Sequence, residues 1–228
     1  MNAAVVVTGA AGALGGGVLA ELLSRDLTVL ALDLAGPRLD ETGSRPGVHP
    51  VAVELADRES VRAAWQQIDA LGAGAPAALV TLAGGFAPGS LAELGEKSLD
   101  SMWRTNVVSM LWSCQEAAPR MAAAGGGAIV TVGSKTAVSG AAPLAYATSK
   151  SAVLRASELL ADELRPQRIR VNCILPSVID TPANRAWMSP SLTARAVKPA
   201  AIAKVIAFLI GPDSAPVSGA GIPVYGDA

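Results

Sequence analysis

Short runs of aliphatic residues recur along the chain, and glycine, proline or small polar residues separate them. Apolar runs of this length, rich in Val, Ile and Leu and bounded by turn residues, are typical of buried strands. We therefore expect seven strands, at residues 4–7, 27–32, 48–53, 77–82, 127–133, 168–175 and 221–225.

Between these runs, apolar residues recur at helical spacing. A helical pattern after the first strand extends through Leu22 and Leu23, and further patterns predict helices at 60–70, 99–121, 146–164 and 199–210. Asn106 stands in the middle of one of them, where its side chain competes with the backbone for hydrogen bonds. A residue that is unfavourable at its position invites a functional explanation.

Composition limits the classes of protein to consider. With 228 residues, half of them apolar, the chain is long enough for one α/β domain with a buried core. The net charge of −1 does not indicate a basic face for nucleic acid. The uncharged stretches 3–20 and 71–92 are interrupted by Gly or Pro, so we interpret them as strands and turns and expect no membrane span. The first basic residue is Arg25, which argues against a signal peptide.

The cysteines and the single histidine bear on location and metal binding. Cys114 and Cys173 are far apart and lack CxxC spacing, so we expect reduced, buried thiols in a cytoplasmic protein. With His49 as the only histidine and two distant cysteines, we expect no metal site.

Tyr146 and Lys150 open the predicted helix at 146–164 and are four residues apart, which places them on one face. A cation beside a phenol favours phenolate, so we expect Lys150 to lower the Tyr146 pKa from its usual value of ~10 and to make it a proton-transfer group. The ammonium is also a pure donor, suited to holding sugar hydroxyls. This spacing by itself is also common in surface pairs.

A glycine-rich turn with the sequence TGAAGALGGG, residues 8–17, joins the first strand to the first helix. Glycines in this context permit positive φ and close backbone approach, and a helix N-terminus offers free N–H groups to a pyrophosphate. The turn therefore indicates a nucleotide site, with a flexible Gly/Ala turn as the alternative.

The glycine turn and the YxxxK spacing together resemble the short-chain dehydrogenase/reductase family, and the resemblance covers nearly the whole chain. It implies a single doubly wound α/β domain of Rossmann type, with a seven-stranded parallel sheet and helices on both faces. It also implies hydride transfer between a nicotinamide cofactor and an alcohol/carbonyl pair. A homodimer or homotetramer, formed through the helices at 99–121 and 146–164, is expected as well.

The resemblance assigns four catalytic residues. Tyr146 exchanges a proton with the substrate oxygen, and Ser134, at the exit of the fifth strand, donates a hydrogen bond to that oxygen. Lys150 lowers the phenol pKa and holds the nicotinamide ribose. Asn106 bends its helix and holds a water of the proton relay. The interval from Ser134 to Tyr146 is 12 residues, one less than the family's commonest spacing, and Ser139 is the alternative serine.

The cofactor is expected to be NAD, with NADP as the alternative. Asp33 follows the second strand, where a dinucleotide fold places an acid that binds the ribose hydroxyls and repels a 2′-phosphate. Arg38 is the residue that would favour NADP instead, and a helix cap or turn residue is the other interpretation of Asp33. The expected cofactor-binding residues are Gly9, Ala11, Gly12, Leu14, Gly15, Asp33, Glu54, Leu55, Ala83, Gly84, Tyr146, Lys150, Pro176, Val178 and Thr181.

Several positions depart from the family's pattern. Glu54 replaces the usual Asp beside the adenine, Thr81 and Leu82 occupy the Asn positions before Ala83-Gly84, and Ser177 replaces the Gly after Pro176. Two alternative functions stay open: a dihydropteridine-reductase-like enzyme, and a non-catalytic NAD-binding regulatory protein.

The substrate is the least determined part of the sequence. Residues 183–198 are expected to form a short lid over a small-molecule alcohol or carbonyl substrate. This segment has no charge cluster that would indicate a phosphate, coenzyme A or a carrier protein.

Overall fold

A computed structural model of the chain describes residues 3–228 and shows one seven-stranded sheet. The strand order is β3-β2-β1-β4-β5-β6-β7, and every neighbouring pair is parallel. Strand β1 lies between β2 and β4, so the order of strands reverses there. Loops that leave β1 and β4 diverge at such a point, which opens a crevice at the carboxyl edge of the sheet.

All seven predicted strands are confirmed. Each begins and ends within one residue of the predicted position. They are β1 (Ala4–Thr8), β2 (Thr28–Asp33), β3 (Val48–Ala52), β4 (Ala78–Thr81), β5 (Gly127–Val132), β6 (Ile169–Pro176) and β7 (Gly221–Val224). The doubly wound parallel sheet that the family resemblance implied is also confirmed.

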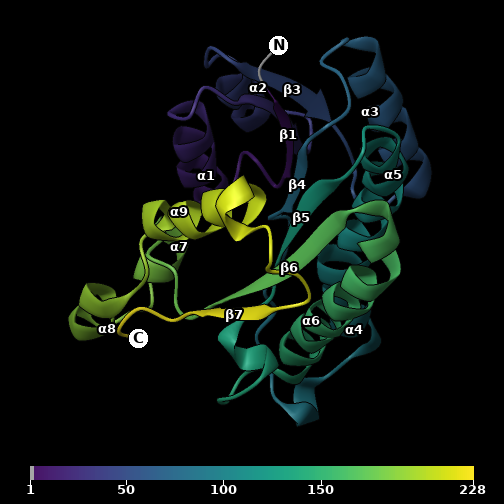
Figure 1. Cartoon of the computed structure of the whole chain (residues 1–228). Coiled ribbons are helices and arrows are strands. Elements are labelled where there is room, and N and C mark those ends of the chain that lie inside the picture. Colours follow the sequence, from purple (N-terminus) through teal and green to yellow (C-terminus); the bar gives the residue numbers. More distant parts are fainter. Residues whose placement is uncertain (1–2) are drawn as a thin grey trace.

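Helices cover both faces of the sheet (Figure 1). On one face, α1 (Ala13–Leu23) packs against α9 (Pro199–Ile210). The opposite face carries α3 (Arg58–Ala70), α5 (Ser109–Ala123) and α6 (Leu144–Leu164). The remaining helices are α2 (Pro37–Gly43), α4 (Glu96–Trp103), α7 (Pro182–Arg185) and α8 (Pro190–Arg195).

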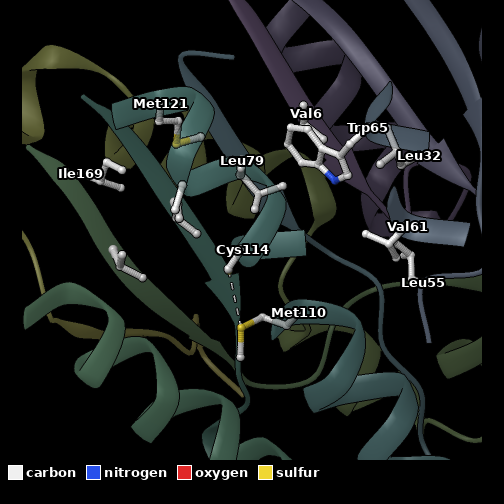
Figure 2. Close-up of a cluster of buried hydrophobic side chains, with 14 of the residues drawn as sticks. Val6, Leu32, Leu55, Val61, Trp65, Leu79, Met110, Cys114, Met121 and Ile169 are labelled. Carbon is white, nitrogen blue, oxygen red and sulfur yellow. Dashed lines mark hydrogen bonds between the residues drawn. The ribbon is translucent and has the colours of Figure 1, made fainter. Parts of the chain in front are cut away.

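Alternate residues of each strand supply the two hydrophobic cores. In β1, Val6 faces the core under α3, α5 and α6, whereas Val5 and Val7 face the core under α1 and α9. This alternation follows from the pleat of a strand, and burial on both faces explains why the strands are apolar throughout. Figure 2 shows the first of these cores, where the Trp65 indole lies beside Val6 and Leu32.

The predicted continuous helix at 99–121 is wrong in its middle. It consists of α4, a π-helical turn at Arg104–Val108 and α5, and it begins earlier, at Glu96. Asn106, where the family resemblance implied a bend, lies within the π turn. A π turn adds one residue to the ladder and re-aims a side chain, and periodicity over a long window does not resolve it.

Two further findings concern the whole chain. Cys114 and Cys173 are buried and free, as predicted from their spacing. Within residues 3–228, no helix combines the length and the apolar character needed to cross a membrane.

Trp65→Ala should lower the free energy of unfolding by about 3–5 kcal/mol, because it removes one of the largest fully buried side chains and leaves a cavity between α3 and the sheet. Trp103→Ala is the matched control, since Trp103 is half exposed on α4, and it should change the value by only ~0.5 kcal/mol. Chemical denaturation of both variants measures the difference, and equal losses would contradict this account of the core.

Candidate active site

Close backbone contacts form the turn after β1. Gly9 has φ of 67°, and a Cβ on it would lie 2.6 Å from the amide nitrogen of Ala83 in the loop after β4. A Cβ on Gly15 would lie 2.3 Å from the carbonyl oxygen of Ala10. Only glycine fits at these two positions, because a side chain would collide with neighbouring backbone.

Asp33 ends β2 beside this turn. One carboxylate oxygen accepts a hydrogen bond from the backbone N–H of Ala11 at 2.8 Å, and the other accepts from the N–H of Leu34 at 2.8 Å. The side chain therefore fixes the glycine turn to the end of β2. A carboxylate oxygen has more than one acceptor position, so Asp33 retains capacity for a ligand's hydroxyl groups.

A cavity of about 550 Å³ opens along the carboxyl ends of β1 to β4. Eight of the predicted cofactor residues line it: Gly9, Ala11, Gly12, Asp33, Glu54, Leu55, Ala83 and Gly84. Arg38, at the start of α2, also lines it, as do Thr105 and Ser109, which the sequence did not single out. Leu14, Gly15, Tyr146, Lys150, Pro176, Val178 and Thr181 do not line this cavity.

Glu54, the departure from the family's Asp, turns back on its own loop. Its carboxylate accepts a hydrogen bond from the Ala56 N–H at 3.2 Å, and its backbone N–H donates to the Ser60 hydroxyl at 2.9 Å. Asp57 caps α3 by accepting from the Ser60 N–H at 2.7 Å. The loop is thus held by its own side chains.

Gly84 connects the cavity to the predicted catalytic residues. A Cβ at this position would lie 2.9 Å from Asn106 Oδ1 and 3.2 Å from Lys150 Nζ. Asn106 and Lys150 are far apart in the sequence, and the structure brings both side chains to the backbone of Gly84. Spacing in the sequence does not show that these two side chains meet at one place.

Asn106 is buried and holds three parts of the chain together. Its Oδ1 accepts a hydrogen bond from the Gly85 N–H at 2.8 Å, and its Nδ2 donates to the Ser149 hydroxyl at 2.9 Å and to the Gly85 carbonyl at 3.2 Å. The π turn, the loop after β4 and α6 are therefore connected through one amide.

Lys150 is only 6% exposed, and its Nζ donates a hydrogen bond to the carbonyl oxygen of Val132 at 2.8 Å. Burial disfavours the ammonium form and lowers the pKa of Lys150 to about 8, and the nearby Cys173 acts in the opposite direction.

Tyr146 lies one helical turn before Lys150 on α6, but its pKa does not fall as predicted. Burial raises the pKa of the phenol above its ordinary value, and the hydroxyl of Ser134 beside it opposes part of that rise. The expected lowering by Lys150 is not found, because desolvation dominates and the ammonium is bound to a carbonyl.

Ser134 lies just beyond β5, as predicted. Its Oγ lies 2.9 Å from the hydroxyl of Thr136 and accepts a hydrogen bond from the Thr136 N–H at 3.2 Å. Sequence reasoning missed Thr136, whose signal was a second hydroxyl two residues after the serine.

The segment after β6 is held by its own contacts. The Val178 carbonyl accepts from the Val197 N–H at 2.9 Å, and the Thr181 hydroxyl accepts from the Asn184 N–H at 3.2 Å to cap α7. The Ser177 hydroxyl donates to the Tyr225 carbonyl, so the residue that replaces the family's Gly binds the segment after β7.

Phe86 is a further residue that the sequence did not single out. Its ring centroid lies 5.0 Å from that of Tyr146, with an angle of 67° between the rings. Its signal in the sequence was an aromatic residue directly after Gly84-Gly85.

Three features come together in this structure: a doubly wound sheet, a glycine turn where the strand order reverses, and a Tyr/Lys pair beside the end of β5. They are typical of nicotinamide-dependent oxidoreductases with a Rossmann-type fold. The model of the short chain dehydrogenase family matches residues 3–191. The chain therefore belongs to the short-chain dehydrogenase/reductase family, as its motifs indicated.

Relatives cover almost the full length. D-threitol dehydrogenase of Mycolicibacterium smegmatis is 32% identical over 97% of this chain and 90% of its own. D-xylose 1-dehydrogenase of Caulobacter vibrioides is 28% identical over 94% and 91%. A 3-oxoacyl-[acyl-carrier protein] reductase from Brucella melitensis, solved with bound NAD, superposes with a TM-score of 0.87 at 26% identity, over 99% of this chain and 90% of that one. This protein is an NAD(P)-dependent oxidoreductase that transfers hydride between the nicotinamide and an alcohol or carbonyl substrate.

The stability of the wild type should rise with pH relative to Lys150→Met between pH ~8 and ~10.4. In this window the unfolded lysine, with a pKa of ~10.4, still holds the proton that the buried lysine has lost, so the unfolded state binds more protons. The difference in Tm between the two proteins, measured from pH 7 to 10, checks the shift. If the difference in Tm does not change with pH, burial does not lower the pKa of Lys150, and the interpretation is wrong.

Proposed function

We propose that this chain is an NAD-dependent dehydrogenase/reductase of a neutral alcohol/carbonyl pair, with Tyr146, Ser134, Lys150 and Asn106 as its active site. The observation that carries the proposal is the convergence of Asn106 and Lys150 on Gly84, at the end of the cavity along the sheet. Tyr146 lies one helical turn before Lys150 on α6, and the hydroxyl of Ser134 lies beside its phenol.

The residues present fit a dinucleotide. The missing side chains of Gly9 and Gly15 let the backbone of the turn approach closely, and the N-terminus of α1 begins directly after Gly12. Asp33 would hold the adenosine ribose, and Lys150 would hold the nicotinamide ribose. A bound nicotinamide supplies or accepts the hydride.

The protein's own residues then handle the proton. Burial raises the Tyr146 pKa, so the phenol is protonated at neutral pH and ready to donate to a carbonyl oxygen. Ser134 donates a hydrogen bond to the same oxygen as negative charge develops on it. Asn106 fixes the position of α6 through Ser149 and, in this proposal, holds the water through which Tyr146 is reprotonated.

Asp33 supports NAD as the cofactor, because a 2′-phosphate would meet its carboxylate at the mouth of the cavity. Arg38 lines the same cavity and is the residue that opposes this preference. The backbone N–H groups of Ala11 and Leu34 orient the carboxylate, which favours ribose recognition over a role as a helix cap.

The substrate is proposed to be small and neutral. The lid at residues 183–198 contains α8 and most of α7, and its Arg185 is paired with Asp180, so this charge is already engaged. The two sequence relatives are named for neutral polyhydroxylated compounds, D-threitol and D-xylose.

We also propose one domain with a homodimeric or homotetrameric assembly in the cytoplasm. A hollow of about 470 Å³ lies between α5 and α6 and is lined by Leu111, Trp112 and Leu160, among others. Leu159 on α6 is half exposed beside it. Apolar helix faces of this kind suit packing across a two-fold axis.

Tyr146→Phe should lower kcat by at least ~10²-fold, the lower range for positioned acid–base groups, while NAD(H) binding changes little. The substitution removes only the phenol oxygen and keeps the ring against Phe86. Steady-state kinetics and fluorescence titration with NADH measure the two effects. Near-normal kcat in a step limited by chemistry would exclude Tyr146 as the proton-transfer group.

Asp33→Ser should lower the ratio of kcat/KM with NAD to that with NADP by ~10-fold or more. The carboxylate's hydrogen bonds to ribose hydroxyls are worth roughly 1.5–3 kcal/mol each, and its repulsion of a 2′-phosphate is lost at the same time. Adding Leu34→Arg should lower the ratio further, since Leu34 lines the cavity and Arg binds phosphate through two hydrogen bonds. A wild type that already prefers NADP would overturn the proposal and point to Arg38.

A further inference from the structure

Phe86 is exposed in an unusual place. It is 63% exposed, yet its ring packs against Tyr146, with centroids 5.0 Å apart and an angle of 67° between the planes. This is the edge-to-face geometry that aromatic pairs prefer. The ring therefore packs on the proposed proton donor and leaves most of its surface open to the solvent from which a substrate would arrive.

The backbone before Phe86 is firmly held. Asn106 binds Gly85 twice, accepting from its N–H at 2.8 Å and donating to its carbonyl at 3.2 Å. A Cβ on Gly85 would lie 3.3 Å from both the Met102 and the Thr105 side chains, so this loop packs closely on α4 and the π turn. The backbone from which the Phe86 ring projects is thus held by the same amide that links the loop to α6.

Two cations in the segments around the site are already engaged. Lys135, next to Ser134, donates to the Ala228 carbonyl at 3.0 Å and lies 5.1 Å from the centre of the Tyr225 ring. Arg185 is paired with Asp180. Both cations already have partners within the protein, and the apolar ring of Phe86 is the group that packs directly on Tyr146.

We propose that Phe86 is a specificity-determining residue: its ring forms one wall of the substrate site and selects neutral substrates that carry a ring at or next to the reacting carbon. This inference rests on the proposed function of Tyr146. A substrate oxygen within hydrogen-bond distance of the Tyr146 phenol places the neighbouring carbon atoms within reach of the Phe86 ring.

The physical basis is contact between two flat surfaces. A ring presents several C–H groups or a π-face in one plane, and it loses no internal rotations when it stacks on an aromatic side chain. An acyclic chain gains less contact and must be ordered first. A sugar ring and a carbocyclic ring can both stack on Phe86 in this way. The experiment therefore tests one substrate of each kind.

The test measures kcat and KM with NAD for two pairs of alcohols, each a ring compound and an acyclic one: 1-phenylethanol with 2-butanol, and D-xylose with D-threitol. In at least one of the two pairs, Phe86→Ala should lower kcat/KM for the ring compound by about tenfold, mainly by raising KM. For the acyclic compound of the same pair, kcat/KM should fall by about twofold or less. Phe86→Tyr should retain the wild-type ratio, and Phe86→Leu should lie between. The pair that responds identifies carbocyclic or sugar rings as the substrate class.

Phe208→Ala is the matched control, because the chain has only two phenylalanines and Phe208 is exposed on α9. It should leave all four values unchanged, with a Tm equal to that of Phe86→Ala within a few degrees.

Four results would overturn the inference. Equal losses for ring and acyclic substrates would make Phe86 a residue that only positions Tyr146. A rise in KM for NAD alone would assign the ring to the cofactor. Turnover of acyclic substrates alone would contradict selection of rings while leaving the proposed function intact, whereas no turnover of any alcohol would contradict that function as well.

Discussion

The close approach of two backbone loops at the centre of the sheet is the constraint on which the active site depends. The turn after β1 and the loop after β4 meet at Gly9 and Ala83, where no side chain could fit. Because Gly84 follows directly and lies against Asn106 and Lys150, any displacement of this junction would move the proposed cofactor cavity and the proposed catalytic side chains together. Two glycines and one small loop thus connect the binding of the dinucleotide with the place of reaction.

Burial governs the electrostatics of the site more than pairing does. Desolvation raises the pKa of Tyr146 and lowers that of Lys150, so both groups are shifted toward their neutral forms. Their positions on one face of α6 predicted a lowered Tyr146 pKa, but burial raises it, and Lys150 donates to the carbonyl of Val132. The phenol therefore keeps its proton in the free protein, which suits donation to a carbonyl oxygen.

Family membership and substrate choice depend on different parts of the molecule. The matching family model and the relatives establish hydride transfer on an alcohol or carbonyl. The scaffold that the family shares does not determine which alcohol, because substrates contact loop side chains that vary independently of the sheet. In this chain the loop side chains near Tyr146 include Phe86, which packs edge-to-face on it, and the lid residue Arg185 is paired with Asp180.

The sequence by itself determined the strands, the class of fold and the family, because buried parallel strands are apolar along their whole length and glycine turns have few substitutes. It also placed Ser134 at the end of β5 and Asp33 at the end of β2, since both follow strands that are easily recognised. It did not reveal the π turn at Asn106, the partner of Lys150 or the packing of Phe86 on Tyr146. Only the tertiary structure decided these features. The contacts join segments far apart in the chain, and the π turn depends on a single extra residue in a helix. Neither kind of feature leaves a periodic pattern in the sequence.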